Sequence, residues 1–286
     1  MISIVVLTKN EEKDLPRCLN SVSWCNDVHV LDSGSTDGTV EIAIQYGAKV
    51  SRNAFKSFGE QRNYALDNLE LQTWILFLDA DEVVPKKFKA ELMKAIRDAD
   101  ENVAGYYCCW KMMLYGKWLK RCDNFPKWQF RLMRKGKARF TDFGHGQKED
   151  KVQGEIQYLK EPYLHYGFSK GWFYWMERHN KYSTQEAVAR SGKRPPFKKI
   201  FTKDASVRNP ALKSWLSRIP GWPFLRFFQA YFLNLGFTEG TPGFIYCINM
   251  AYYEFLIQIK MKELHKEKPK AEDSKAVSAN MTFENS

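Results

Sequence analysis

The chain has 286 residues, of which 44% are hydrophobic and 15% aromatic, a composition that supports a buried core and excludes a disordered chain. Its formal net charge of +11 is uneven, because the segments 111–139 and 190–226 each contain ten basic residues and a single aspartate. Such segments attract anions, and the open interpretations are nucleic acid, anionic lipid, a diphosphate substrate or a solvated basic surface.

Residues 1–109 alternate strand and helix patterns. Apolar runs predict strands at Ile2–Leu7, Val28–Leu31, Ala48–Arg52, Trp74–Leu78 and Ala104–Cys109. Helical patterns lie between them, at Glu11–Val22, Thr39–Tyr46, Gly59–Leu69 and Pro85–Asp98. Near-continuous apolar strands separated by helices predict an α/β fold with a mostly parallel sheet that is covered on both faces.

Ligands of such sheets bind at the carboxyl ends of the strands, where this chain has Thr8–Glu11, Asp32–Asp37 and Asp79–Glu82. Neither GxGxxG nor GxxxxGK[ST] occurs there, which disfavours a dinucleotide fold and a P-loop. The segment DSGSTDGT begins at Asp32, which is a candidate for contact with a base or ribose. The alternative is a turn followed by helix capping through Thr36 or Asp37.

The segment Trp74–Glu82, WILFLDADE, runs from an apolar strand into two aspartates that are separated by one residue. Side chains two apart on an extended segment share a face, so Asp79 and Asp81 can contact the same ligand. Mg²⁺ prefers carboxylate oxygen and is often held by one or two carboxylates plus substrate phosphates. The pair therefore predicts a divalent metal that carries phosphates, with an ordinary Asp-containing turn as the alternative.

Residues 111–170 contain further polar candidates. In QFRLMRKGKARF, Arg131 and Arg134 stand beside aromatics, which indicates either a basic loop for phosphates or a strand edge protected by charge. His165 and His179 have no second His or Cys at metal-ligand spacing, so structural roles are expected. The six cysteines include no CxxC pair, and MISIVVL at the N-terminus is a strand pattern without a signal sequence. We therefore expect reduced thiols and a cytosolic location.

From residue 171 the chain is predicted to be helical and is rich in aromatics. Between Lys213 and Phe228, tryptophan and phenylalanine alternate with lysine and arginine, a composition that fits the bilayer interface. The stretch 244–259 is interrupted by three polar residues and falls short of the roughly 20 apolar residues that a span requires. We expect peripheral attachment to an anionic membrane surface; packing of these helices on the sheet or on a second subunit is the alternative.

Four motifs occur in order along the chain: TKNEEKDLPRCLNSV, VLDSGSTDGT, GEQRNYAL and WILFLDADE. Together they resemble the nucleotide-binding half of glycosyltransferase family 2, whose fold is GT-A, a Rossmann-like α/β fold. Over about the first 190 residues the chain is more closely similar to the bacterial lipopolysaccharide-core and exopolysaccharide glucosyltransferase branch. This resemblance implies inverting transfer of glucose or another hexose from a UDP-sugar, with Mg²⁺ or Mn²⁺, to a lipid-linked or lipopolysaccharide-core saccharide.

The expected organisation combines this resemblance for residues 1–170 with the composition of the remaining residues. Residues 1–110 form the half that binds the nucleotide sugar, and 111–170 form the half of the same domain that binds the acceptor and supplies the base. Residues 171–265 form an aromatic-rich helical appendage, and 266–286 form a polar tail. The enzyme would work on the inner face of the cytoplasmic membrane as a peripheral protein.

Carried over by position, the resemblance implies donor-binding roles for the motif residues: Thr8, Asn10 and Glu11 in the nucleotide pocket, Asp32 on uracil or ribose, and Arg62 and Asn63 beside the nucleotide. It makes Asp81 the direct metal ligand. Asp79 would contact ribose or support the metal shell.

An inverting displacement also requires a base that deprotonates the acceptor hydroxyl. The segment 143–150, FGHGQKED, supplies Glu149 as the first choice and Asp150 as the second, while His145 would orient the base or the acceptor. Relatives in this branch more often have glutamate directly after the histidine, whereas Gly146 follows here. The choice between the two acids stays open, and an exposed turn is the alternative.

Two other classes of function are open at this point. A sugar-phosphate nucleotidyltransferase also has a metal-bearing α/β sheet, but it would show a glycine-rich basic loop where TKNEEKD stands. A non-catalytic basic module for anionic lipid or nucleic acid would set Asp32, Asp79 and Asp81 against phosphates unless a metal intervened. We therefore expect no nucleic-acid partner.

Overall fold

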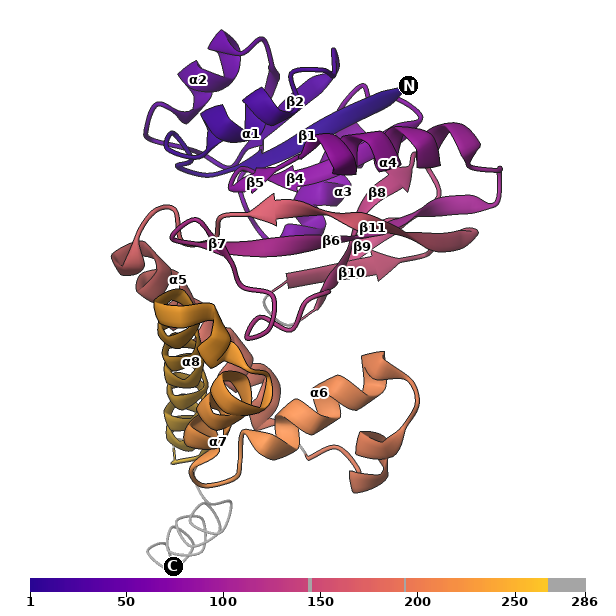
Figure 1. Cartoon of the computed structure of the whole chain (residues 1–286). Coiled ribbons are helices and arrows are strands. Elements are labelled where there is room, and N and C mark those ends of the chain that lie inside the picture. The colour runs from indigo at the N-terminus through magenta and orange to yellow at the C-terminus, as the bar shows by residue number, and fades with distance from the viewer. Residues whose placement is uncertain (144–145, 193, 267–286) are drawn as a thin grey trace, which may run out of the picture. The chain divides into compact units, whose positions relative to one another are not determined.

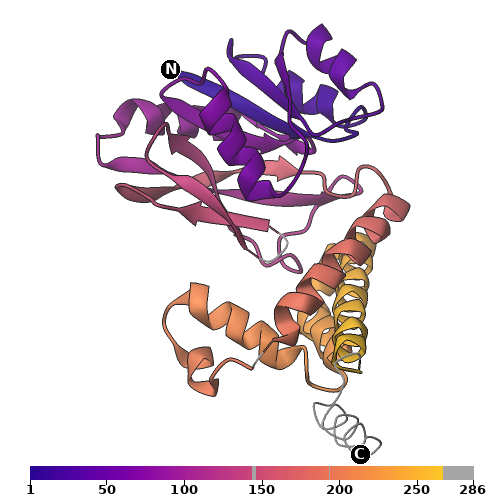
Figure 2. The ribbon, with the colours of Figure 1, turned by 180° about the vertical axis from the view of Figure 1, so that it is seen from behind.

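The computed structural model describes residues 1–143, 146–192 and 194–266. The chain divides into two compact units, one made of residues 1–177 and 229–247, the other of 178–228 and the residues from 248 onward. Figures 1 and 2 show the elements of both from opposite sides.

The first unit is built on a nine-stranded sheet in the order β3-β2-β1-β4-β8-β6-β11-β5, with β7 paired to β6. Its strands are β1 (Ile2–Thr8), β2 (Val28–Asp32), β3 (Lys49–Arg52), β4 (Trp74–Asp79), β5 (Glu82–Val83), β6 (Val103–Leu114), β7 (Lys117–Trp118), β8 (Trp128–Arg134) and β11 (Glu155–His165). Neighbours are parallel from β3 to β4 and between β6 and β11. Because β8 is antiparallel to both β4 and β6, those two strands run in the same direction. The predicted mostly parallel sheet is confirmed.

Helices cover both faces of this sheet, as the alternation of buried side chains requires. Ile4 and Val6 pack with residues of α1 (Leu15–Ser21), α2 (Thr39–Gln45) and α4 (Lys86–Asp98). Val5 and Leu7 point the other way, toward α3 (Phe58–Asn68). Each large apolar side chain so buried contributes about 1.5–3 kcal/mol relative to an exposed one. The chain therefore has two separate apolar layers, one on each face.

A second, two-stranded sheet of β9 (Arg139–Phe143) and β10 (Gly146–Asp150) packs on α3. The approach is close at Gly59, where an added Cβ would lie 2.8 Å from Oδ1 of Asp142 and 3.2 Å from the carbonyl carbon of Thr141. Asn63, one turn later on α3, donates from its amide to the Phe140 carbonyl at 2.8 Å and accepts from the Phe140 N–H at 3.0 Å. These contacts fix the hairpin against the helix.

Residues 229–247 also belong to the first unit. They form a π-helix, η2 (Gln229–Leu233), a 3₁₀ helix, η3 (Gly236–Glu239), and the start of α8 (Gly240–Lys266). Glu239 accepts hydrogen bonds from the N–H groups of Arg121 at 2.7 Å and Cys122 at 3.2 Å. The Tyr246 hydroxyl donates to the buried carboxylate of Asp123. These bonds attach the segment to the loop before β8.

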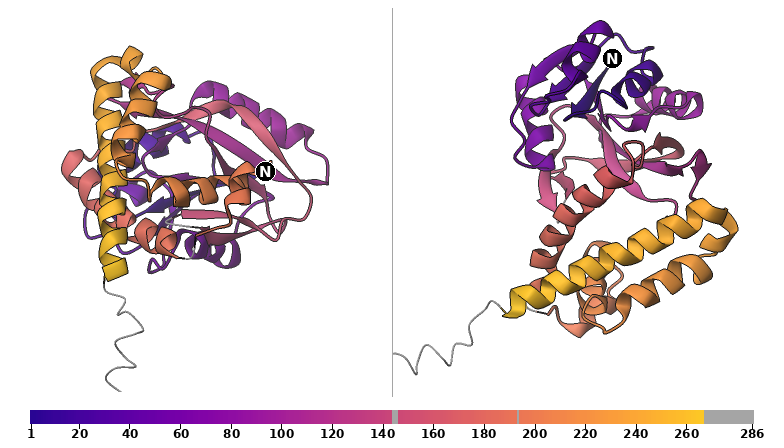
Figure 3. Two further views of the ribbon diagram at one scale, coloured as in Figure 1. Left: turned by 90° about the horizontal axis from the view of Figure 1, so that it is seen from below. Right: turned by 90° about the vertical axis from the view of Figure 1, so that its left-hand side faces the viewer.

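The second unit is helical, as predicted for this part of the chain (Figure 3). It holds most of α5 (Trp172–Ser191), the 3₁₀ helix η1 (Phe197–Phe201), α6 (Ala205–Leu216), α7 (Trp222–Phe228) and the rest of α8. Ala187, Ile257 and Met261 form its small buried core. In the described ranges, no helix has the length and apolar character that crossing a membrane requires.

The buried arginine of this unit, Arg190, joins α5 to α8. Its guanidinium lies 2.7 Å from Glu186 and 2.9 Å from Glu254. The indole N–H of Trp222 donates to the same Glu254 carboxylate at 3.1 Å. Trp222 is therefore directed toward α8 and takes part in packing.

Candidate functional site

The carboxyl ends of three neighbouring strands lie side by side at one edge of the sheet. Leu7 of β1 pairs with Leu31 of β2 and with Asp79 of β4. β11 reaches the same region, because its last residue, His165, pairs with Glu82 of β5. The backbone N–H of Tyr166, the following residue, donates to the Asp81 carbonyl at 2.9 Å. The strand-end carboxylates that the sequence singles out are thus brought together with the end of β11.

Asp81 and His165 face one another, with Oδ2 and Nε2 3.3 Å apart. Burial alone would lower the pKa of the imidazole, but the nearby carboxylates of Asp81, Glu82 and Asp79 outweigh it and the pKa is raised. The sequence predicts a structural role for His165, since no second histidine or cysteine stands at ligand spacing. Its partner is an aspartate distant in sequence, which spacing alone does not reveal.

This pair of oxygen and nitrogen donors fits a divalent cation that is completed by substrate. The part of the chain that the structure describes has no cluster of three or more His, Cys, Asp and Glu side chains able to hold a metal. Mg²⁺ is commonly held by one or two carboxylates together with phosphate oxygens. Imidazole is a common metal ligand in general, although Mg²⁺ and Mn²⁺ prefer oxygen. Asp81 and His165 meet that requirement when a diphosphate supplies the other ligands.

Asp79 is half-buried next to three buried charged side chains, Arg62, Glu82 and Arg131. Its carboxylate accepts from Arg131 at 2.8 Å and from Arg62 at 3.2 Å. Glu82 lies 2.6 Å from Arg131 and accepts from the Asp79 N–H at 2.8 Å. Burial by itself would raise the pKa of Asp79, but the charges of Arg131 and Arg62 lower it, so the carboxylate stays ionised. Both of its oxygens are engaged by arginines.

Arg131 occupies neither of the places that the sequence analysis gave it. It is 2% exposed, so it is neither a solvated strand edge nor part of an open basic loop. Its burial could have been predicted from its position inside the apolar strand β8, between Phe130 and Leu132. An arginine in the interior of a strand pattern needs a buried acidic partner, and Asp79 and Glu82 are those partners.

Glu11 is half-buried beside Lys170, whose Nζ lies 2.5 Å from Oε1. Burial raises the pKa of this carboxyl to about 7, although Lys170 acts in the opposite direction. The lysine also donates to the Asn10 carbonyl at 2.7 Å, and Ser169 Oγ donates to Asp14 at 2.5 Å. The segment after β11 is therefore hydrogen-bonded to the loop after β1, a connection that the sequence analysis missed.

Asp32 is fully buried and organises the loop that follows β2. It accepts from the N–H groups of Gly34 and Ser35, both at 2.9 Å, and from Thr8 Oγ1 at 3.2 Å. Asn10 accepts from the Thr36 N–H at 2.8 Å. These bonds match the turn that the sequence analysis gave as the alternative for Asp32. Contact of Thr8, Asn10 or Asp32 with a nucleotide stays a prediction.

Two consecutive residues of α3, Arg62 and Asn63, were expected beside the nucleotide. Arg62 is buried against Asp79, and burial lowers its pKa to about 10 despite the neighbouring carboxylate. Both the oxygen and the nitrogen of the Asn63 amide are bonded to the β9 backbone at Phe140. Arg62 thus contacts the end of β4, and Asn63 contacts the β9–β10 hairpin.

The candidate bases lie on β10. Glu149 is half-buried and accepts a hydrogen bond from the Tyr107 hydroxyl, whose pKa is raised by burial and by this carboxylate. Asp150 is exposed at the end of the hairpin, paired in the ladder with Arg139. His145 lies outside the described residues. The two acids therefore differ in their surroundings: Glu149 is bonded to Tyr107 of β6 in the large sheet, whereas Asp150 is exposed.

Known proteins resemble the chain over almost its whole length. Residues 3–147 match the family model of glycosyl transferase family 2. The chain is 28% identical over 284 residues to the lipopolysaccharide core biosynthesis glycosyltransferase LpsC of Rhizobium meliloti (strain 1021), covering 96% of this chain and 97% of that protein. It is 29% identical over 280 residues to an uncharacterized glycosyltransferase of Rickettsia conorii (strain ATCC VR-613 / Malish 7), covering 92% and 90%.

Solved structures also resemble it. The mannosyltransferase PcManGT from Pyrobaculum calidifontis, in complex with GDP-Man and Mn²⁺, is 17% identical with a TM-score of 0.49, covering 91% of this chain and 86% of that one. S. aureus TarS 1–349 is 17% identical with a TM-score of 0.47, covering 93% and 91%.

Proposed function

The chain belongs to glycosyl transferase family 2, and on that premise we propose that it transfers a hexose, with inversion, from a UDP-sugar to a lipid-linked or lipopolysaccharide-core saccharide. The observation that carries the proposal is the pair formed by Asp81, after the end of β4, and His165, at the end of β11, beside an aspartate held ionised by two arginines. The name of the Rhizobium meliloti relative supports the class of acceptor. Family membership favours glycosyl transfer over the nucleotidyltransferase and the non-catalytic basic module.

The donor would bind across the ends of β1, β2 and β4. Glu11 supports this placement, because its Oε2 is buried and has no hydrogen-bond partner within the described residues, which leaves it for a hydroxyl of the nucleotide. Asp81 and His165 would hold Mg²⁺ or Mn²⁺, and the cation would neutralise the charge that develops on the departing diphosphate. Arg62 and Arg131 keep Asp79 fixed and ionised next to this position.

Glu149 would accept the proton of the attacking hydroxyl. Its hydrogen bond from Tyr107 fixes one carboxylate oxygen, and the packing of the hairpin on α3 fixes the strand that carries it. A general base must lie within hydrogen-bond reach of the hydroxyl it deprotonates, so a rigid carrier strand is an advantage. Assays of transfer from a panel of UDP-sugars to deacylated and intact lipopolysaccharide core, with and without Mn²⁺, test the reaction directly.

Glu149→Gln is expected to lower kcat at least about a hundredfold, since the amide cannot accept the proton. UDP affinity should stay within about twofold, because the other side of the site holds the nucleotide. Asp150→Asn is the matched control and should keep near-normal turnover. If the control variant loses turnover and Glu149→Gln does not, the base is Asp150; if neither loses it, the hairpin carries no base.

We also place the reaction at the inner face of the cytoplasmic membrane, with the helical second unit as a peripheral anchor. Phe224 and Phe228 of α7 are 82% and 51% exposed, and α7 also carries Arg226. Exposed aromatic side chains next to basic ones fit the bilayer interface. Trp222, in contrast, packs toward α8 through Glu254 and is not a candidate for insertion.

The double variant Phe224→Ser/Phe228→Ser is expected to bind phosphatidylglycerol liposomes at least about tenfold more weakly in co-sedimentation, because two apolar side chains no longer enter the bilayer. Ile44→Ser/Met93→Ser, which removes two exposed apolar side chains from the α/β unit, should bind as the wild type does. If both variants bind liposomes equally well, α7 does not contribute to membrane attachment.

A further inference from the structure

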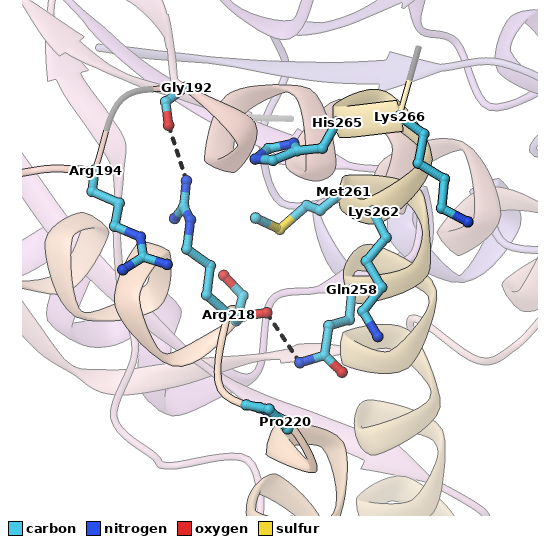
Figure 4. A pocket seen from close by; sticks show the side chains of 10 residues that line it. Gly192, Arg194, Arg218, Pro220, Gln258, Met261, Lys262, His265 and Lys266 are labelled. Atoms are coloured by element: carbon cyan, nitrogen blue, oxygen red, sulfur yellow. Dashed lines mark hydrogen bonds between the residues drawn. The ribbon is translucent and has the colours of Figure 1, made fainter. Parts of the chain in front are cut away.

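The second unit contains a cavity of about 480 Å³ that is lined by cations. Arg194 and Arg218 line it from the segment between α5 and α7, and Lys262, His265 and Lys266 line it from the last turns of α8 (Figure 4). Met261 closes the cavity on the α8 side, where it belongs to the buried core of this unit. No aspartate or glutamate is among the residues that line it within the described ranges.

Arg218 is held in place by neutral groups. It donates to the carbonyl oxygens of Arg190 at 2.5 Å and Gly192 at 2.9 Å, and to the hydroxyl of Ser214 at 2.6 Å. Arg190, whose carbonyl oxygen accepts one of these bonds, is itself neutralised by Glu186 and Glu254. The described contacts of Arg218, in contrast, include no carboxylate. Among the described residues, the site therefore presents a fixed guanidinium whose charge no acidic side chain balances.

A second feature distinguishes this cavity from a simple basic surface. Pro220 lines it, and the residues around Pro220 in the chain expose apolar side chains: Ile219, Phe224 and Leu225 are 42%, 82% and 51% exposed. The backbone turns sharply here, since Gly221 has φ of 75° and the Trp222 N–H donates to the Ile219 carbonyl at 3.1 Å. A cationic cavity with an apolar border matches a ligand that carries both a phosphate and a hydrocarbon part.

We propose that this cavity binds the phosphate headgroup of an anionic lipid. Arg218 would supply the fixed donors, and Arg194, Lys262 and Lys266 would supply charge around the phosphate oxygens. The lipid chains would lie along the exposed side chains that follow Pro220. The site shares no residue with the strand ends that hold the donor, so it depends neither on transfer nor on which sugar is moved.

The test uses the full chain and dihexanoyl phosphatidic acid below its critical micelle concentration, titrated by calorimetry. Arg194→Ala/Lys262→Ala/Lys266→Ala removes three exposed cations of the cavity and leaves Arg218 in place. Lys198→Ala/Lys199→Ala/Lys213→Ala removes the same charge from exposed positions of the same unit that do not line the cavity. Thermal melting curves of both variants check that the fold is kept.

We expect the cavity variant to bind the short-chain phosphatidic acid at least about thirtyfold more weakly and the control variant to lose less than about threefold. Dihexanoyl phosphatidylcholine and inorganic phosphate should each bind more weakly than the phosphatidic acid. Equal losses of affinity in the two variants would show that the positive charge of the whole unit attracts the lipid, and the proposal of a specific site would be wrong. If inorganic phosphate binds as tightly as the lipid, the cavity is a free-phosphate site and the lipid assignment is wrong.

Discussion

Asp81→Asn is expected to lower the turnover of sugar transfer at least about a hundredfold, the effect of removing a principal electrostatic stabiliser from an active site. The amide has the shape of the carboxylate but not its charge, so the variant keeps the fold and loses the cation that His165 and Asp81 would share. The apparent affinity for Mn²⁺ in the presence of UDP should fall with it. Transfer rates and Mn²⁺ titrations on the purified variant measure both effects.

Asp98→Asn is the matched control for that experiment. Asp98 makes an exposed ion pair with Arg97, so the same chemical change there should leave both transfer and Mn²⁺ affinity unaltered. Turnover of Asp81→Asn close to that of the wild type would refute the metal assignment and with it the proposed role of His165.

Arg131→Met is expected to lower the free energy of unfolding by about 3–5 kcal/mol, because it leaves Glu82 buried without its cation and removes one of the two arginines on Asp79. Urea unfolding measures the change. Arg97→Met, which breaks the exposed pair with Asp98, should cost no more than about 1 kcal/mol. The double variant Arg131→Met/Glu82→Met should recover part of the loss, since the unpaired buried carboxylate is gone.

Comparable stability of Arg131→Met and Arg97→Met would mean that the network around Asp79 contributes little to the fold. A loss in the double variant as large as in the single one would assign the effect to Asp79 instead of Glu82. Both results come from unfolding measurements and need no activity assay. They are therefore independent of which sugar donor the enzyme uses.

The strands and the place of the site follow from local pattern, and for that reason the sequence analysis could find them. Apolar runs identify β1 and β4 because both faces of those strands are buried, and Asp79 and Asp81 stand where ligands of parallel sheets bind. Helix α1 begins at Leu15, later than predicted, because the Leu15 N–H and the Asp14 N–H both bond to the Glu11 carbonyl and make a turn.

The partners of the site residues could not be found in this way. Arg131 is 52 positions from Asp79 and Lys170 is 159 positions from Glu11, and periodicity carries no information at that range. The pairing of Arg131 with Asp79 depends on β8 lying antiparallel between β4 and β6, which requires the order of strands in the whole sheet. The composition of a strand does not specify its neighbours.

The same limit applies to the C-terminal third. Its aromatic content predicted helices, but the division of α8 between the two compact units depends on Glu239 and Tyr246 finding partners in the loop before β8. The alternation of aromatic and basic residues from 213 to 228 also does not say which rings face outward. Trp222 packs toward α8, whereas Phe224 is exposed.

The two adjacent side chains on α3 limit how this enzyme can be recombined with its relatives. Arg62 reaches the end of β4 and Asn63 reaches β9, and a one-residue change in helix register would rotate both by about 100°. The hairpin that carries Glu149 is consequently matched to one particular helix. A chimera that takes residues 139–150 from another family member to change acceptor preference has to take α3 from the same parent.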